Sequence, residues 1–235
     1  MDERPHESGT ADLESGATEE KPLMITGEML VPPAQEETRR EFEHGMSYWQ
    51  PITIGLIAVI TVVFAWQLAA GALESEAAIV AAGALARDRL LEGEVWRLLS
   101  AVFLHGGIEH LLGNAFALYV LGMAVEHALG KARTAWVFMA AGLGGSLLSA
   151  ALSEGPSVGA SGAIFGLMGS AIVFFYKFRE HFFFREKRLG LVLVVWALYS
   201  IVTGFMSPMI DNWAHIGGLI GGALATLPLR ARVVT

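Results

Sequence analysis

The sequence predicts an all-α polytopic membrane protein with six transmembrane helices. Of its 235 residues, 54% are hydrophobic and only 17% are charged, whereas soluble domains carry about 25% charged residues. The mean hydropathy is +0.51. From residue 51 onward the chain contains six largely uncharged runs, each close to the length of about 20 residues that crosses a bilayer as a helix. We expect these helices over residues 51–72, 108–126, 134–153, 157–177, 189–206 and 212–230.

The first 48 residues differ in composition from the rest of the chain. They contain twelve of the 23 acidic residues but only four of the 16 basic ones. A segment of this kind, without apolar periodicity, buries too little apolar surface to offset the entropy of ordering. We therefore expect a disordered acidic tail over residues 1–48 and a membrane domain over residues 49–235. The acidic tail and the scattered basic residues carry no signature of nucleic-acid binding.

Lys and Arg residues orient the predicted bundle, because cytoplasmic loops of membrane proteins are enriched in them. With both termini in the cytoplasm, nine basic residues lie on the inner side: Lys131, Arg133, Lys177, Arg179, Arg185, Lys187, Arg188, Arg230 and Arg232. The outer side then holds only Arg87, Arg89 and Arg97. We expect a multi-pass protein of the cell (inner) membrane, embedded in the lipid bilayer, with cytoplasmic N- and C-termini.

The connection over residues 74–105 follows the first expected helix. It is too long for a turn and too polar to span a membrane, and it mixes leucines with charged residues. Such a pattern is typical of an amphipathic segment that lies in the membrane interface. Trp96 and Arg97 are the expected interfacial anchor of this segment.

The helix expected over residues 108–126 carries polar side chains, which are unfavourable inside a bilayer and therefore candidates for function. His110 and Asn114 are four residues apart and share one helix face, and His105 precedes them. Two interpretations stay open at this point. The side chains either pack helices together through hydrogen bonds or supply neutral imidazoles to a metal ion.

The helix expected over residues 157–177 carries Ser161 near its start. A lone serine in a membrane helix usually hydrogen-bonds a backbone carbonyl one turn back and does no chemistry. Ser161, however, is flanked by Gly159 and Gly162. At the start of the run its hydroxyl can meet water, and a backbone flanked by glycine can approach a substrate closely.

The helix expected over residues 212–230 carries His215 near its outer end. Small residues on a membrane helix allow a second helix to approach closely. Two glycine stripes are the expected contact: Gly217, Gly218, Gly221 and Gly222 on this helix, and Gly162, Gly166 and Gly169 on the helix that carries Ser161. Packing of these stripes would bring the His215 imidazole to the Ser161 hydroxyl.

The polar residues of these three helices share one depth, because all three helices begin on the outer side in this orientation. A serine, a histidine base and further hydrogen-bond donors are the components of acyl transfer. No acidic residue is expected on these faces, which favours a Ser–His dyad over a triad. The chain has no cysteine, which excludes disulfides, thiolate zinc sites and cysteine nucleophiles.

Taken together, the motifs resemble those of the rhomboid intramembrane serine proteases over about residues 50–230. Three motifs carry the resemblance: HxxxN at His110–Asn114 with His105 before it, GxSG at Gly159–Gly162, and AHxxGxxxG at Ala214–Gly222. Trp96–Arg97 is similar to the WR pair of the family's first loop. Glu126 is similar to the acidic residue at the end of the family's second helix.

The resemblance implies a six-helix rhomboid-like bundle that acts as an intramembrane serine endopeptidase. Ser161 would be the nucleophile and His215 the general base. His110, Asn114 and the Ser161 backbone N–H would stabilise the oxyanion, and Phe165 would stack on His215. The supporting residues would be His105, Gly159, Gly162, Phe165, Gly218, Gly222, Trp96, Arg97 and Glu126. The substrates would be transmembrane helices of membrane proteins cut near the outer interface, with no metal and no cofactor.

Two other functions stay open. An inactive rhomboid-like protein would bind membrane helices without cutting them, although the presence of both Ser161 and His215 disfavours it. A metal or proton transporter could use His105, His110 and His215. The sequence shows neither an intramembrane carboxylate beside these histidines nor the broken-helix repeats of transporters.

Overall fold

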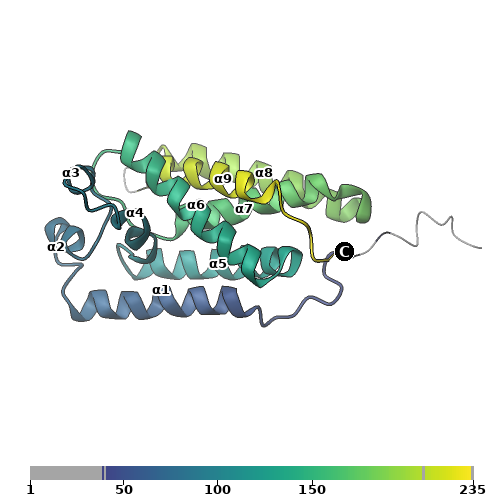
Figure 1. Cartoon of the computed structure of the whole chain (residues 1–235), viewed down its shortest axis with the longest axis horizontal. Helices are drawn as coiled ribbons and strands as arrows, with labels where there is room; N and C mark the ends of the chain where they lie inside the picture. Colours follow the sequence, from purple (N-terminus) through teal and green to yellow (C-terminus); the bar gives the residue numbers. More distant parts are fainter. Residues whose placement is uncertain (1–38, 40, 208–209, 234–235) are drawn as a thin grey trace, which may run out of the picture. The chain divides into compact units, whose positions relative to one another are not determined.

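The computed structural model describes residue 39 and residues 41–207 and 210–233 (Figure 1). Most of the tail expected over residues 1–48 lies outside the described residues, so its disorder stays a prediction. The regular elements within the described residues are all helices, apart from one isolated bridge between Leu85 and Ser157. This confirms the predicted all-α fold class.

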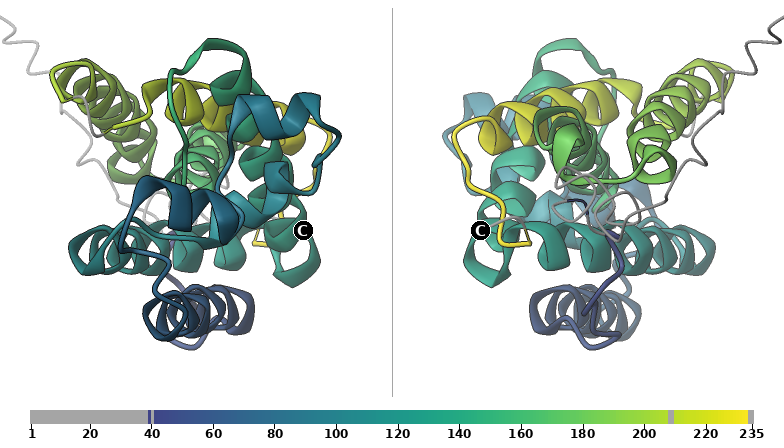
Figure 2. Two further views of the ribbon diagram at one scale, coloured as in Figure 1. Left: turned by 90° about the vertical axis from the view of Figure 1, so that its left-hand side faces the viewer. Right: turned by 90° about the vertical axis from the view of Figure 1, so that its right-hand side faces the viewer.

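Six long helices form the bundle. They are α1 (Pro51–Ala69), α5 (Ile108–Leu129), α6 (Lys131–Leu152), α7 (Ser161–Lys177), α8 (Phe184–Gly204) and α9 (Asn212–Thr226). By length and composition, α1, α5 and α6 can each cross a membrane, while α7 and the Arg188–Gly204 part of α8 are shorter apolar helices. Helix α7 packs against α5, α6, α8 and α9, and the end-on views in Figure 2 show α1 and α8 at the periphery.

The helix ends differ from the expected ones for local reasons. Helices α6 and α8 begin before their uncharged runs, because backbone hydrogen bonding continues through charged first turns at the polar edge of the bundle. Helix α1 ends at Ala69, just before Gly71 takes a φ of +66°. Helix α9 ends at Thr226, because Pro228 has no N–H with which to continue the helix.

Helix α7 begins at Ser161, four residues after the expected start at 157. The backbone over residues 153–159 is not helical and is tied to the first connection. The Leu85 and Ser157 N–H groups each donate to the other residue's carbonyl, at 3.0 and 2.9 Å, and the Gly159 N–H donates to the Ala101 carbonyl at 2.9 Å. Ser161 therefore occupies the first turn of α7, after a segment whose path is fixed by these bonds.

The first connection folds into short helices rather than one amphipathic segment. They are α2 (Glu76–Ala81), α3 (Arg87–Leu91) and α4 (Arg97–Ser100). Arg97 corrects the expectation of an interfacial anchor, because its side chain is buried inside the connection. Its guanidinium donates to the Val80 and Ala84 carbonyls and forms an ion pair with Glu94. A buried guanidinium needs such partners, and Arg97 thus holds the connection together from within.

Glu126 lies at the opposite end of α5 from His110 and caps α1. Its buried carboxylate accepts hydrogen bonds from the backbone N–H groups of Ile52 and Thr53, at 3.0 and 2.8 Å, and from the Thr53 hydroxyl at 2.9 Å. The first N–H groups of a helix have no partners within the helix, and a negative charge there also interacts favourably with the helix dipole. Glu126 therefore joins α1 to α5.

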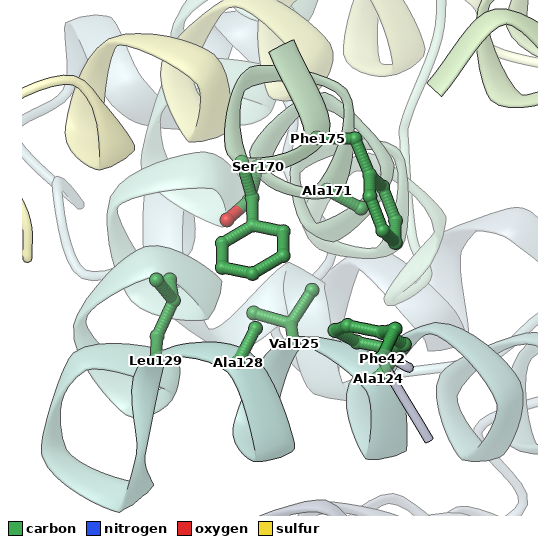
Figure 3. Close-up of a pocket in the computed structure, with 9 residues that line it drawn as sticks. Phe42, Ala124, Val125, Ala128, Leu129, Ser170, Ala171 and Phe175 are labelled. Carbon is green, nitrogen blue, oxygen red and sulfur yellow. The ribbon is translucent and has the colours of Figure 1, made fainter. Parts of the chain in front are cut away.

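Phe42 packs against the C-terminal parts of α5 and α7, although it precedes the expected domain boundary at residue 49. Its ring is only 6% exposed, and Figure 3 shows it beside Ala124 and Val125 of α5, opposite Phe175 of α7. The Phe42 carbonyl lies 2.8 Å from His127 Nε2. The boundary expected at residues 48 and 49 is therefore too late, because the membrane domain includes Phe42.

We expect Phe42→Ala to lower the stability of the membrane domain. Truncating a buried phenylalanine costs about 3–5 kcal/mol, and Phe42 also makes edge-to-face contacts with Phe174 and Phe175. Thermal unfolding in detergent measures the change. Tyr48→Ala is the matched control, because Tyr48 is 80% exposed and its loss should leave the unfolding temperature unchanged. Equal unfolding temperatures for both variants would contradict the docking of Phe42.

Candidate active site

The N-terminal ends of α7 and α9 bring a serine to a histidine. Ser161 is the first residue of α7, and His215 lies in the first turn of α9. His215 Nε2 lies 3.0 Å from Ser161 Oγ, within the range for proton transfer between a nucleophile and its base. Residues 54 positions apart in the chain are thereby placed in hydrogen-bond contact.

This approach depends on glycine at the contact between α7 and α9. A Cβ atom added at Gly218 would lie 1.9 Å from the Gly162 carbonyl oxygen, and one at Gly222 would lie 2.0 Å from the Gly166 carbonyl oxygen. Any side chain at these positions would push α9 away from α7 and His215 away from Ser161. Gly218 and Gly222 therefore meet α7 backbone to backbone, as expected. Gly217 and Gly221, the other two glycines of the expected stripe, face α6 instead.

Phe165 lies one turn after Ser161 and stacks on His215. The ring centroids are 4.2 Å apart and the planes differ by 7°. His215 Nδ1 is buried and has no hydrogen-bond partner among the described residues. The orientation of the imidazole is therefore set by the Phe165 ring on its face and by Ser161 at Nε2.

His110 and Asn114 of α5 converge on the backbone of Gly159, two residues before Ser161. The position of a Cβ at Gly159 is 2.7 Å from His110 Nε2 and 3.5 Å from Asn114 Nδ2. The Gly106 N–H donates to His110 Nδ1 at 3.4 Å, so a neutral imidazole carries its proton on Nε2. Asn114 Nδ2 is buried and has no hydrogen-bond partner among the described residues. Two N–H donors thus point to the segment that precedes the serine hydroxyl.

His105 lies behind His110 and is held by α1. Gln67 Nε2 donates to the His105 carbonyl at 3.0 Å, and the His105 N–H donates to Gln67 Oε1 at 2.9 Å. The His105 and His110 rings meet edge to face with centroids 5.1 Å apart. Burial lowers the pKa of His105 to about 4, so its imidazole is neutral at neutral pH. No local sequence pattern indicates this role of Gln67, because its partner is 38 residues away.

The remaining predicted residues lie outside this cluster. Trp96 and Arg97 stabilise the first connection, and Glu126 caps α1. The described part of the chain contains no group of three His, Asp or Glu side chains arranged to hold a metal ion. One acidic residue, Asp211, lies near the cluster at the N-terminus of α9 and accepts a hydrogen bond from the Ala214 N–H at 3.1 Å. An aspartate just before an apolar run is an N-cap signal.

A polar cavity of about 350 Å³ lies next to the cluster. Its walls are residues 152–157, which lead to Ser161, and residues of the 204–213 segment, which lead to His215. Among them are the polar side chains of Ser153, Glu154, Ser157, Ser207 and Asp211. Water can therefore reach the C-terminal end of α6 and the N-terminal end of α9.

We expect Gly159→Ala to reduce the activity of this site strongly. Gly159 has a φ of +128°, and its added Cβ would lie 2.6 Å from His110 Cε1 and displace that ring. Gly155→Ala is the matched control, because Gly155 also has a positive φ, +81°, but nothing lies within 4 Å of the added Cβ. Both variants should lose about 1–2 kcal/mol of stability from backbone strain.

Measured per folded molecule, only Gly159→Ala should lose turnover. Equal turnover in the two variants, each corrected for the folded fraction, would remove His110 and the Gly159 backbone from the active arrangement.

Comparison with known proteins identifies the family. Residues 92–232 match the model of the Rhomboid domain. The chain is 37% identical to Rhomboid protease GluP of Bacillus subtilis (strain 168) over 83% of its own length and 38% of that protein. It is 40% identical to RHOMBOID-like protein 5 of Arabidopsis thaliana over 60% of its own length and 46% of that protein. It is 34% identical to Putative rhomboid protease YdcA of Bacillus subtilis (strain 168), over 56% of its own length and 66% of that protein.

The aligned part of the chain thus spans less than half the length of GluP and of RHOMBOID-like protein 5. The matched region includes both Ser161 and His215. With its apolar helices, the chain is an integral membrane protein, and it belongs to the rhomboid family.

Proposed function

We propose that this protein is an intramembrane serine endopeptidase that cleaves transmembrane helices of other membrane proteins near the outer interface. The observation that carries the proposal is the 3.0 Å contact between Ser161 Oγ and His215 Nε2. Two relatives bear the name of rhomboid proteases, which supports a protease-like function for the family.

The geometry supports a two-step acyl transfer. His215 Nε2 takes the Ser161 proton while Oγ forms a bond to the carbonyl carbon of the scissile peptide. The His110 and Asn114 side chains and the Ser161 N–H donate hydrogen bonds to the resulting oxyanion. His215 then gives the proton to the leaving amine as the C–N bond breaks. A water molecule, deprotonated by the same histidine, hydrolyses the acyl-enzyme ester and restores Ser161.

The proposed substrate must be extended where it is cut, because the peptide bonds of a helix are shielded by their own hydrogen bonds. Cleavage near the outer interface satisfies this requirement, since water and the polar cavity beside residues 152–157 can solvate the unwound backbone. Irregular backbone at membrane depth is tolerated where it lines such a cavity. This favours substrates whose helices unwind readily near their outer ends.

Cleavage in proteoliposomes tests the proposal. The purified protein is reconstituted with a single-span test substrate, and the products are identified by mass spectrometry. We expect one cut near the outer interface, absent with Ser161→Ala. Binding of the substrate without any cut by the parent protein would instead favour the inactive helix-binding alternative.

We also propose that both termini lie in the cytoplasm and that the site faces the outer side of the inner membrane. The chain has no cysteine, so single-cysteine variants report accessibility cleanly. Glu154 and His181 are exposed side chains at the outer and inner ends in this orientation. We expect a membrane-impermeant maleimide to label Glu154→Cys in intact spheroplasts, and His181→Cys only after permeabilisation. The reverse pattern would invert the orientation.

A further inference from the structure

One carboxylate joins the end of α6 to the start of α9. Asp211 is the N-cap of α9 and accepts a hydrogen bond from the Ala214 N–H at 3.1 Å. The same carboxylate accepts hydrogen bonds from the hydroxyls of Ser149 and Ser153, each at 2.5 Å. Ser149 lies in the last turn of α6, and Ser153 is its C-cap. Asp211 therefore ties two helices together at the outer end of the bundle.

The Asp211 carboxylate is charged at neutral pH. Burial raises the pKa of this carboxyl. The hydrogen bonds that it accepts from Ser149, Ser153 and Ser157 and from the Ala214 N–H outweigh burial, so its pKa lies below the ordinary value. Hydrogen bonds to a charged acceptor are stronger than those between neutral groups. The tie between α6 and α9 is therefore a strong one.

The turn that Asp211 anchors is the turn that carries His215. The His215 N–H donates to the Asp211 carbonyl at 3.3 Å. On its other side, this turn rests on two glycines. A Cβ added at Gly145 of α6 or at Gly162 of α7 would lie 2.7 or 3.0 Å from the Ala214 carbonyl oxygen. The glycines set how closely the turn approaches α6 and α7, while Asp211 fixes its position along them.

A backbone hydrogen bond links Asp211 to His215, and among the described residues no hydrogen bond joins the Asp211 carboxylate to the imidazole. His215 Nδ1 has no hydrogen-bond partner among the described residues, so Asp211 is not the third member of a triad. The position of the turn nonetheless decides where Nε2 meets Ser161 Oγ. In an active site, a misplacement of 1 Å can cost about a hundredfold in rate.

We propose that Asp211 is a positioning residue for the Ser161–His215 pair. Its carboxylate holds the first turn of α9 against the end of α6, and this tie keeps His215 Nε2 within proton-transfer distance of Ser161 Oγ. The inference rests on the proposed serine protease function, because it assigns no chemistry of its own to Asp211.

The test compares three variants that weaken the tie to different degrees. Asp211→Ala removes every hydrogen bond that the carboxylate accepts. The double variant Ser149→Ala/Ser153→Ala keeps the carboxylate and the helix cap but removes the link to α6. Asp211→Asn keeps an acceptor for the Ala214 N–H and is the conservative rescue. Glu76→Ala is the matched control, because Glu76 is an exposed carboxylate in the first turn of the short helix α2 and does not line the cavity.

Four quantities are measured below the unfolding temperature of every variant: the folded fraction, the rate at which a fluorophosphonate labels Ser161, and kcat and KM for the test substrate. We expect Asp211→Ala to reduce the labelling rate and kcat by about 10- to 100-fold, with KM changed by less than about threefold. The double serine variant should show the same kind of loss, Asp211→Asn a smaller one, and Glu76→Ala none.

Three results would overturn the positioning role. One is labelling at the parent rate by Asp211→Ala. Another is a loss of labelling that only follows the folded fraction. A third is full activity in the double serine variant with equal losses in Asp211→Asn and Asp211→Ala, which would indicate an effect of charge alone. Failure of the underlying function looks different, since the parent protein and Glu76→Ala would then show neither labelling nor cleavage.

Discussion

Replacing Ser161 or His215 by alanine is expected to reduce turnover of a transmembrane substrate by about 10⁴-fold or more, to the background rate. The reason lies in their 3.0 Å contact: the hydroxyl is a weak nucleophile without its base, and the base has no proton to accept without the hydroxyl. The measurement is initial cleavage rate per folded molecule in proteoliposomes.

The double variant Ser161→Ala/His215→Ala is the control for this prediction. If the two residues act as one unit, the double variant should be no slower than either single variant. Thermal unfolding of all three should stay close to that of the parent, because neither side chain is needed for the glycine contacts between α7 and α9. A single variant that retains a tenth of parental turnover would contradict the dyad.

Asn114→Ala is expected to lower kcat by about a hundredfold to a thousandfold with a smaller effect on KM. Loss of one oxyanion donor costs roughly this much in other hydrolases, about 3–4 kcal/mol. Asn114 Nδ2 is a buried donor that points to the Gly159 backbone and has no hydrogen-bond partner among the described residues. The Asn114 amide is a hydrogen-bond donor and not the base. Its removal should therefore slow the fluorophosphonate labelling of Ser161 without preventing it.

Gly113→Ala is the matched control for Asn114→Ala. It lies on the same helix, and a Cβ added there meets nothing within 4 Å, so both stability and turnover should be unchanged. If Asn114 serves packing alone, Asn114→Ala will lose stability but keep full turnover per folded molecule. That result would contradict its role as an oxyanion donor. Measuring both quantities on one preparation separates the two roles.

The six-helix class follows from the sequence because a bilayer requires long apolar runs, and the charges between the runs mark their ends. The pairing of Ser161 with His215 was also predictable, since glycine stripes on two helices that begin on the same side indicate which faces meet. Both predictions use a pattern that is visible in the sequence of one helix, the apolar run, or in the sequences of two helices compared, the glycine stripes.

The remaining features depend on contacts that no local pattern encodes. Phe42 is a single aromatic residue in an acidic segment, and its docking depends on a groove formed by α5 and α7. The pair Trp96–Arg97 has the sequence pattern of an interfacial anchor, but Arg97 is buried because the first connection folds around it. The late start of helix α7 depends on the first connection, because Leu85 pairs with Ser157 and Gly159 bonds to Ala101, which keeps these residues out of the helix.

The role of Asp211 at the candidate site also depends on contacts that no local sequence pattern encodes. Its position before an apolar run predicts an N-cap, but its role between two helices depends on serines 58 and 62 residues away. Spacing along the chain does not reveal such a contact, which forms only when α9 packs against α6.

The most direct test of the central claim is the site at which a fluorophosphonate modifies the folded protein. Such a reagent forms a stable bond with a serine oxygen only where a base activates the hydroxyl. The protein in detergent is labelled, digested and mapped by mass spectrometry, beside His215→Ala treated in the same way. We predict one adduct, on Ser161, that is absent from His215→Ala. Cleavage of substrate by a protein that acquires no adduct on Ser161, or an equal adduct in His215→Ala, would contradict the account.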